Sequence, residues 1–247
     1  MDTYHSLISQ TFDFPTDEFH VEDNELRFHD IDLMALVEKH GTPLRIAYLP
    51  KISSQIQRAK EWFRLGIEQT GYQGKYSYAY CTKASHFSFV VEEALKNGVH
   101  IETSSWFDTN IIRAMHAKGK VTKDTFIICN GFKTEEYKYE ITRLINDGFV
   151  NCMPILDSPN EVDYYHDNVR EKCNVGMRLA SDEEPRFQFY TSRLGIRYAD
   201  ALPLYQQKIK DDPRFELTML HYFINTGIKD TSYYWSELSR FVHKYCE

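Results

Sequence analysis

The chain has 247 residues, of which 42% are hydrophobic and 26% charged, and its formal net charge is −7. This is the composition of a globular domain that buries roughly 70–75% of its unfolded surface. The negative charge argues against nucleic acid or an acidic membrane as the main partner, and no apolar run approaches the ~18 residues of a transmembrane helix.

Five cysteines are scattered along the chain: Cys81, Cys129, Cys152, Cys173 and Cys246. Their odd number and the lack of a Cys-x-x-Cys pair indicate reduced thiols and a cytoplasmic protein, and no signal peptide is expected at the start. Metal-binding and serine-hydrolase motifs, including HExxH and GxSxG, are absent from the sequence.

Residues 1–29 are polar and aromatic without a clear period, and we expect them to form a lead-in segment before one domain over 30–247. That domain opens with apolar residues at helical spacing, for which Asp30 is the expected N-cap and Gly41 the expected end. A strand is then expected over 44–49.

From residue 51 onward, helical and strand-like patterns alternate. Helices are expected over 51–69, 86–97, 106–117, 134–147, 159–171, 200–210 and 231–246. Strands are expected over 76–82, 99–103, 125–129, 151–156, 175–179 and 215–223. Repeated βα units predict an α/β fold with a parallel sheet. With the strand over 44–49 there are about seven strands, so we expect an incomplete (β/α)8 TIM barrel. A doubly wound open sheet is the alternative, but no GxGxxG follows the first strand.

The stretch 76–86 shows the most informative alternation. In a strand, Tyr76, Tyr78, Tyr80 and Thr82 face one side, suited to packing under helices, and Ser77, Ala79, Cys81 and Lys83 face the other. Lys83 therefore closes a face of small side chains. It is either a solvated lysine at a strand end or a partly desolvated amine that forms a Schiff base.

In a parallel barrel, functional residues gather where strands run into helices. The polar groups at the expected strand ends are Lys83-Ala84, Glu102-Thr103-Ser104-Ser105, Asn130-Gly131, Arg178 and Asn225-Thr226-Gly227. The turn at Asn130-Gly131 has an ordinary interpretation too, since Gly131 permits a positive φ.

The segment Tyr-Cys-Thr-Lys-Ala-Ser ending at Ser85 resembles the Tyr-x-x-Lys-x-Asn strand of the pyridoxal 5'-phosphate (PLP) barrel enzymes. That superfamily holds the ornithine, diaminopimelate and biosynthetic arginine decarboxylases, with alanine racemase as a relative. The resemblance implies that Lys83 carries the cofactor. Cys-Asn-Gly-Phe-Lys at 129–133 resembles the Cys-Asn-Gly-Tyr-Lys of the biosynthetic arginine decarboxylases.

The resemblance implies further cofactor-binding residues. Glu102 and Asp108 match two acids that border the cofactor, although Asp108 is equally placed to stabilise the start of its own helix. Arg178 matches an arginine directed toward the cofactor, with a solvated loop arginine as the alternative.

The segment Leu220–Ile228 aligns with the family's Leu-His-Phe-His-Leu-Gly-Ser-Gln-Ile. Phe223 stands where a histidine stacks on the cofactor ring, and Thr226 stands where a serine holds the phosphate. Phenylalanine can stack but cannot donate a hydrogen bond. His221 is either a partial substitute or a buried core histidine.

Together these matches imply a PLP-dependent amino-acid decarboxylase, expected to convert arginine to agmatine and CO2 in polyamine biosynthesis and to form a homodimer when full length. The family's later phosphate loop and its C-terminal β domain have no counterpart, so we expect an N-terminal portion with weak or no activity on its own. The alternatives are a catalytically inactive PLP-binding relative that associates with a full-length enzyme, and a barrel enzyme whose lysine reacts with a carbonyl substrate without a cofactor.

Overall fold

The computed structural model describes residues 18–180, 194–223 and 231–247. The chain divides into two compact units, one ending at Tyr48 and the other covering Leu49–Glu247. Residues 30–48, which we expected to belong with the barrel, lie in the first of these units. The boundary after residue 29 stays a prediction.

The described part of the first unit is an antiparallel sheet followed by a helix: β1 (Phe19–Glu22), β2 (Glu25–Phe28), β3 (Ile31–Asp32) and α2 (Leu33–His40). Asp23 and Asn24 have positive φ angles of 52° and 68°, the geometry of a two-residue hairpin turn. Because residue 31 pairs with β2, the helix begins later than expected, and Asp32 rather than Asp30 is its N-cap. Gly41 ends it, as predicted.

The strand expected over 44–49 is wrong. Residues 44–48 form no ladder with any part of the chain that the structure describes, and α3 begins at Leu49. The apolar pattern there resembled a strand, but a strand exists only when its backbone groups pair with a neighbour. The parallel sheet therefore has six described strands instead of the expected seven.

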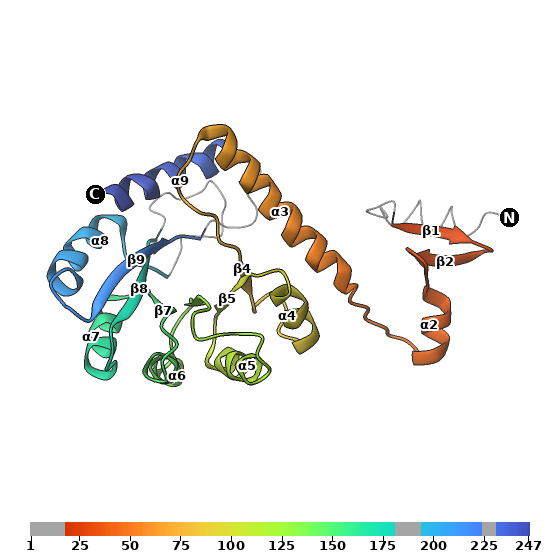
Figure 1. Cartoon of the computed structure of the whole chain (residues 1–247), viewed down its shortest axis with the longest axis horizontal. Helices are drawn as coiled ribbons and strands as arrows, with labels where there is room; N and C mark the ends of the chain where they lie inside the picture. The colour runs from red at the N-terminus through yellow and green to blue at the C-terminus, as the bar shows by residue number, and fades with distance from the viewer. Residues whose placement is uncertain (1–17, 181–193, 224–230) are drawn as a thin grey trace. The chain divides into compact units, whose positions relative to one another are not determined.

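These six strands lie side by side in chain order, all parallel (Figure 1). They are β4 (Ala79–Cys81), β5 (His100–Thr103), β6 (Ile127–Cys129), β7 (Cys152–Leu156), β8 (Cys173–Arg178) and β9 (Phe215–His221). The helices of this unit are α3 (Leu49–Thr70), α4 (Ser88–Leu95), α5 (Trp106–Ala117), α6 (Glu135–Asn146), α7 (Pro159–Asn168), α8 (Tyr198–Leu204) and α9 (Thr231–Cys246). This is the expected α/β architecture, a parallel sheet of barrel type with helices on its outside.

Expected helix limits agree closely in most places. Those of α5 and α9 are the predicted ones, whereas the helix expected over 200–210 begins at Tyr198 and ends in a π-helical turn, Tyr205–Ile209. Within the described residues, no helix combines the length and apolar character needed to cross a membrane.

Side chains alternate between the two faces of the sheet, and the core lies on the helix-facing side. Tyr80, Ile101, Ile127, Cys152 and Val175 contribute to the same apolar core as the helices. The predicted packing of the tyrosine face of residues 76–82 under helices is confirmed for Tyr78 and Tyr80. The intervening residues of each strand face the barrel interior.

A β-bulge in β9 changes this alternation partway along the strand. Val175 pairs with Leu217, but the next residue of β8 pairs with Met219, so Thr218 has no partner in the ladder. Before the bulge, Phe215 and Leu217 pack in the helix-side core, and after it Leu220 and Tyr222 do so. The bulge therefore turns Met219 and His221 to the interior face.

Candidate functional site

The carboxyl ends of all six strands place a polar side chain on the interior face. The register pairs Cys81 with Glu102 and Arg178 with His221, so these strand ends are level with their neighbours. Counting alternate positions from them gives one residue per strand in chain order: Lys83, Glu102, Asn130, Asp157, Arg178 and His221. Four of the six were sequence-predicted, and the sheet brings them to one edge.

Lys83 lies in the tight turn that follows β4, in which the N–H of Ala84 donates to the carbonyl of Cys81 at 3.1 Å. Its side chain is exposed, whereas a reactive amine was expected to be partly desolvated. Lys83 follows β4 at the same edge of the parallel sheet as His221, the last residue of β9, and its charge makes a small contribution to lowering the pKa of that histidine.

Glu102 and His221 are joined through one amide. The Nδ2 atom of Asn130 lies 3.0 Å from Glu102 Oε1 and 3.2 Å from His221 Nε2. These residues come from β5, the end of β6 and β9, so the contact spans the interior of the curved sheet. Burial is the main cause that lowers the pKa of His221 to about 4, with smaller contributions from the charges of Arg178 and Lys133.

We expect this burial of a neutral histidine to make stability depend on pH. Because the pKa falls from 6.5 to about 4 on folding, the stabilisation is present above pH 6.5 and is lost as pH falls toward 4. Between pH 7 and pH 5 the loss is about 2 kcal/mol. Urea unfolding at both pH values should show it in the wild type and not in the His221→Gln variant. Equal losses in both proteins would assign the pH dependence to other groups.

A second polar cluster lies at the ends of β6, β7 and β8. The amine of Lys133 is fully buried and lies 3.3 Å from Asp157 Oδ2 and 3.1 Å from Glu161 Oε2, and it donates to the carbonyl of Gly131 at 3.0 Å. Burial raises the pKa of Glu161, and the charge of Lys133 opposes this.

Arg178 extends this cluster toward β9. Its Nε atom is 3.9 Å from Asp157 Oδ1, an ion pair too long for a hydrogen bond. On its other side the guanidinium carbon lies 5.8 Å from the centre of the Phe223 ring. Arg178 is buried, so the solvated loop arginine considered from the sequence is excluded. Phe223 follows β9 and is 48% exposed.

Two other predicted cofactor-binding residues, Asp108 and Thr226, are not among the side chains described at this edge. Asp108 turns back to its own helix, where its Oδ2 accepts from the N–H groups of Ser104 at 2.8 Å and Ser105 at 3.1 Å. This is the capping interpretation considered from the sequence. Thr226 lies outside the described residues.

Four buried polar atoms at this edge have no hydrogen bond to any residue that the structure describes: Asn130 Oδ1, Asp157 Oδ1, Arg178 Nε and His221 Nδ1. Buried polar atoms are nearly always paired in folded proteins, and unpaired ones gathered at one place indicate a site for a polar ligand. Three cationic groups, Lys83, Lys133 and Arg178, accompany them. The cations suit a ligand that carries anionic oxygens, whereas Asn130 Oδ1 and Asp157 Oδ1 can only accept and therefore suit a hydrogen-bond donor on the ligand. Among the described residues no group of three or more side chains is arranged to bind a metal ion.

Sequence reasoning did not select Asn130, Lys133, Asp157 or Glu161 as site residues. Asn130 was noted as a polar residue at a strand end and as part of the Cys-Asn-Gly-Phe-Lys resemblance, without a role in the site, and the Gly131 that follows it has the positive φ considered for this turn, +86°. The available signal was position: Asn130 and Asp157 follow strands on the same alternate face as Glu102 and Arg178.

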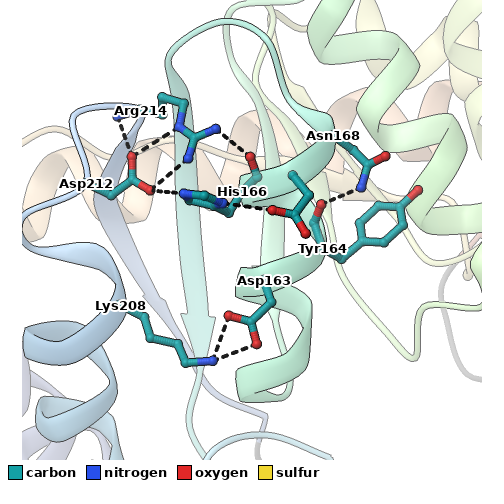
Figure 2. Close-up of polar contacts among 8 residues, drawn as sticks. Asp163, Tyr164, His166, Asn168, Lys208, Asp212 and Arg214 are labelled. Carbon is teal, nitrogen blue, oxygen red and sulfur yellow. Dashed lines mark hydrogen bonds and ion pairs between the residues drawn. The ribbon is translucent and has the colours of Figure 1, made fainter.

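The described surface also contains a cleft of about 540 Å³ between α7 and the segment leading into β9. Figure 2 shows its polar groups paired with one another: Lys208 with Asp163 at 2.6 Å, and Asp212 with both Arg214 and His166 at 3.3 Å. The cleft lies at the amino ends of β8 and β9, and contacts on that face of a barrel serve stability.

Comparisons with known proteins agree with this arrangement. No family model matches the chain. Arginine decarboxylase 1 of Arabidopsis thaliana is 22% identical over 242 residues, covering 91% of this chain and 34% of that protein. The diaminopimelate decarboxylase of M. jannaschii in complex with L-lysine superposes with a TM-score of 0.73 at 22% identity, covering 88% of this chain and 50% of that one.

A further solved structure, SrLDC in complex with PLP and cadaverine, gives a TM-score of 0.65 at 17% identity, covering 91% of this chain and 49% of that one. The chain thus spans about a third of the length of the curated relative and half that of the two solved proteins. Over most of its length, this chain is similar in sequence to arginine decarboxylases, and it shares its barrel-type fold with about half of each of these two solved proteins.

Proposed function

We propose that the chain binds PLP at the carboxyl edge of its sheet and contributes to amino-acid decarboxylation, with arginine as the substrate and agmatine and CO2 as the products. Similarity to arginine decarboxylases supports the substrate, and PLP in a protein of the same fold supports the cofactor. A role in polyamine biosynthesis, a cytoplasmic location and a homodimeric assembly belong to the same proposal.

The observation that carries the proposal is the set of four buried polar atoms, Arg178 Nε among them, that form no hydrogen bond within the described residues, together with the exposed Lys83 at the same edge. PLP, when bound, supplies a ring that withdraws the electrons left behind as a substrate carboxylate departs. The residues of the chain bind and orient the cofactor and the substrate. Lys83 supplies the amine that holds an aldehyde, and Arg178 supplies a buried cation for an anionic oxygen.

Glu102 supplies a fixed negative charge on the interior face. Its Oε1 accepts from Asn130 and from the thiol of Cys81, and its backbone carbonyl accepts from Thr82, so the carboxylate is attached to both neighbouring strands. His221 is neutral at physiological pH and can therefore donate a hydrogen bond from one ring nitrogen and accept one at the other.

Covalent labelling tests the proposal directly. The wild-type chain should be incubated with PLP, treated with borohydride and digested, and the modified peptide identified by mass spectrometry. We expect the phosphopyridoxyl group on Lys83 at low PLP excess, ahead of other exposed lysines. Modification spread evenly over surface lysines, with none preferred, would contradict the proposal.

One observation favours a second candidate function. Phe223, at the position of the family's stacking histidine, offers no hydrogen bond to a substrate carboxylate. A PLP-binding chain that regulates a longer enzyme by association would need no such donor. Labelling at Lys83 without release of CO2 from carboxyl-labelled arginine, together with copurification of a longer decarboxylase, would select this alternative.

A further inference from the structure

Asn130 stands at the centre of the interior face, and its contacts determine which of its atoms face which partner. The side chain is 6% exposed, and its Nδ2 atom lies within hydrogen-bond distance of both Glu102 Oε1 and His221 Nε2. A carboxylate oxygen can only accept, so the nitrogen and not the oxygen of the amide must face Glu102.

The same nitrogen faces the histidine ring, and this fixes the position of the ring proton. An amide nitrogen carries two hydrogens and accepts none, so the second hydrogen is directed to His221 Nε2. That ring nitrogen is therefore the acceptor, and in the neutral ring the proton resides on Nδ1. His221 Nδ1 and Asn130 Oδ1 are both buried, and neither has a hydrogen-bond partner in the part of the chain that the structure describes.

We propose that Asn130 is a positioning residue that holds His221 as the Nδ1–H tautomer and orients the Glu102 carboxylate, leaving one donor and one acceptor for polar groups of the bound ligand. This inference deepens the proposed function and rests on it for the identity of the ligand. The tautomer of His221 and the orientation of the Glu102 carboxylate follow from the contacts of Asn130 and do not depend on which ligand binds.

The electrostatic surroundings of His221 are consistent with a neutral ring. The charges of Arg178 at the end of β8, Lys133 after β6 and Lys83 after β4 all disfavour its protonation. Glu102 on β5 is the nearby anion, and the Asn130 amide lies between it and the ring. Without that amide the carboxylate and the ring could pair directly.

The local backbone keeps the amide in this place. Gly131 follows with a φ of +86°, and a Cβ atom there would lie 3.3 Å from the carbonyl oxygen of Ser104. Asn130 N–H donates to the carbonyl of Thr103 at 3.0 Å, which continues the β5–β6 ladder past its last regular pair. The backbone that carries the amide is thus fixed by the turn and by the sheet together.

The test is a 15N–1H correlation spectrum of histidine side chains in the full chain without cofactor, with His221 assigned through the His221→Gln variant. At pH 7.5 the wild type should show the Nδ1–H tautomer. In Asn130→Asp a carboxylate replaces the donor, so we expect the Nε2–H tautomer and a His221 titration midpoint at least one pH unit higher. Asn110→Asp, an exposed change on α5, should leave both unchanged.

Asn130→Ala guards against misfolding of the aspartate variant, and it should populate both tautomers. A wild-type Nε2–H tautomer overturns the inference, and so does an Nδ1–H tautomer that persists unchanged in either variant. Because these spectra need no PLP, failure of labelling at Lys83 would refute the proposed function while leaving this result to stand or fall separately.

Discussion

The Lys83→Met variant is expected to lose the covalent PLP adduct completely. Of the lysines that the structure describes, Lys83 and Lys133 lie near the carboxyl edge of the sheet, and Lys83 is the one whose amine is available for reaction. Lys133 is buried and surrounded by two carboxylates and two backbone carbonyls, whereas the side chain of Lys83 is exposed. Methionine keeps the length and removes the nucleophile. Absorbance near the band of lysine-bound PLP and peptide mapping after borohydride reduction both measure the loss.

The matched control is Lys96→Met, which removes another exposed lysine, directly after the end of α4. Its adduct yield should equal that of the wild type, and thermal unfolding of both variants should stay close to the wild-type curve because neither side chain is buried. An adduct that forms in Lys83→Met, on Lys133 or elsewhere with the wild-type yield, would place the reactive amine at another residue.

The Lys133→Met variant is expected to be the most destabilised of those considered, by about 3–5 kcal/mol. The lysine amine neutralises Asp157 and Glu161, which remain buried when it is removed. Its removal also leaves the carbonyls of Gly131 and Ile155 without this donor. Two desolvated carboxylates would then repel each other, and this repulsion accounts for most of the expected loss of stability. Urea unfolding at pH 7 measures the change.

Lys172→Met is the control, because Lys172 forms an ion pair with Glu216 in which both side chains are more than half exposed. Such pairs contribute roughly 0–1 kcal/mol. Adding Glu161→Gln to Lys133→Met should recover part of the lost stability by removing one of the two charges. If Lys133→Met lowers the free energy of unfolding no more than Lys172→Met does, the cluster of Lys133, Asp157 and Glu161 is hydrated and does not order the edge of the site.

Local patterns predicted the elements of the fold well because each pattern reports a local preference. The alternation in residues 76–82 gave the two faces of β4, and the helical spacing gave both limits of α5. The residues 44–48 show the limit of this reasoning. Their apolar character suited a strand, but pairing with a neighbour is not a local property and the sequence does not state it.

The candidate site was predictable to the same extent. Lys83, Glu102, Arg178 and His221 follow or end strands, and alternation with the family resemblance was enough to select them. The link from Glu102 through Asn130 to His221 was not, because His221 on β9 is three strands away from β6 in the sheet, and the two residues meet only because the sheet curves around its interior. Asp108 was ambiguous for a physical reason, since an acid in the first turn of a helix suits capping and ligand binding equally.

The bulge at Thr218 has a consequence for how β9 can vary. The inward orientation of His221 depends on the number of residues before it, while the packing of Leu220 and Tyr222 depends on the same count. Exchanging one side chain for another preserves that count, but losing or gaining a single residue would rotate the whole end of the strand, sending the imidazole toward the helices. We therefore expect β9 to tolerate substitutions of its side chains but not insertions or deletions.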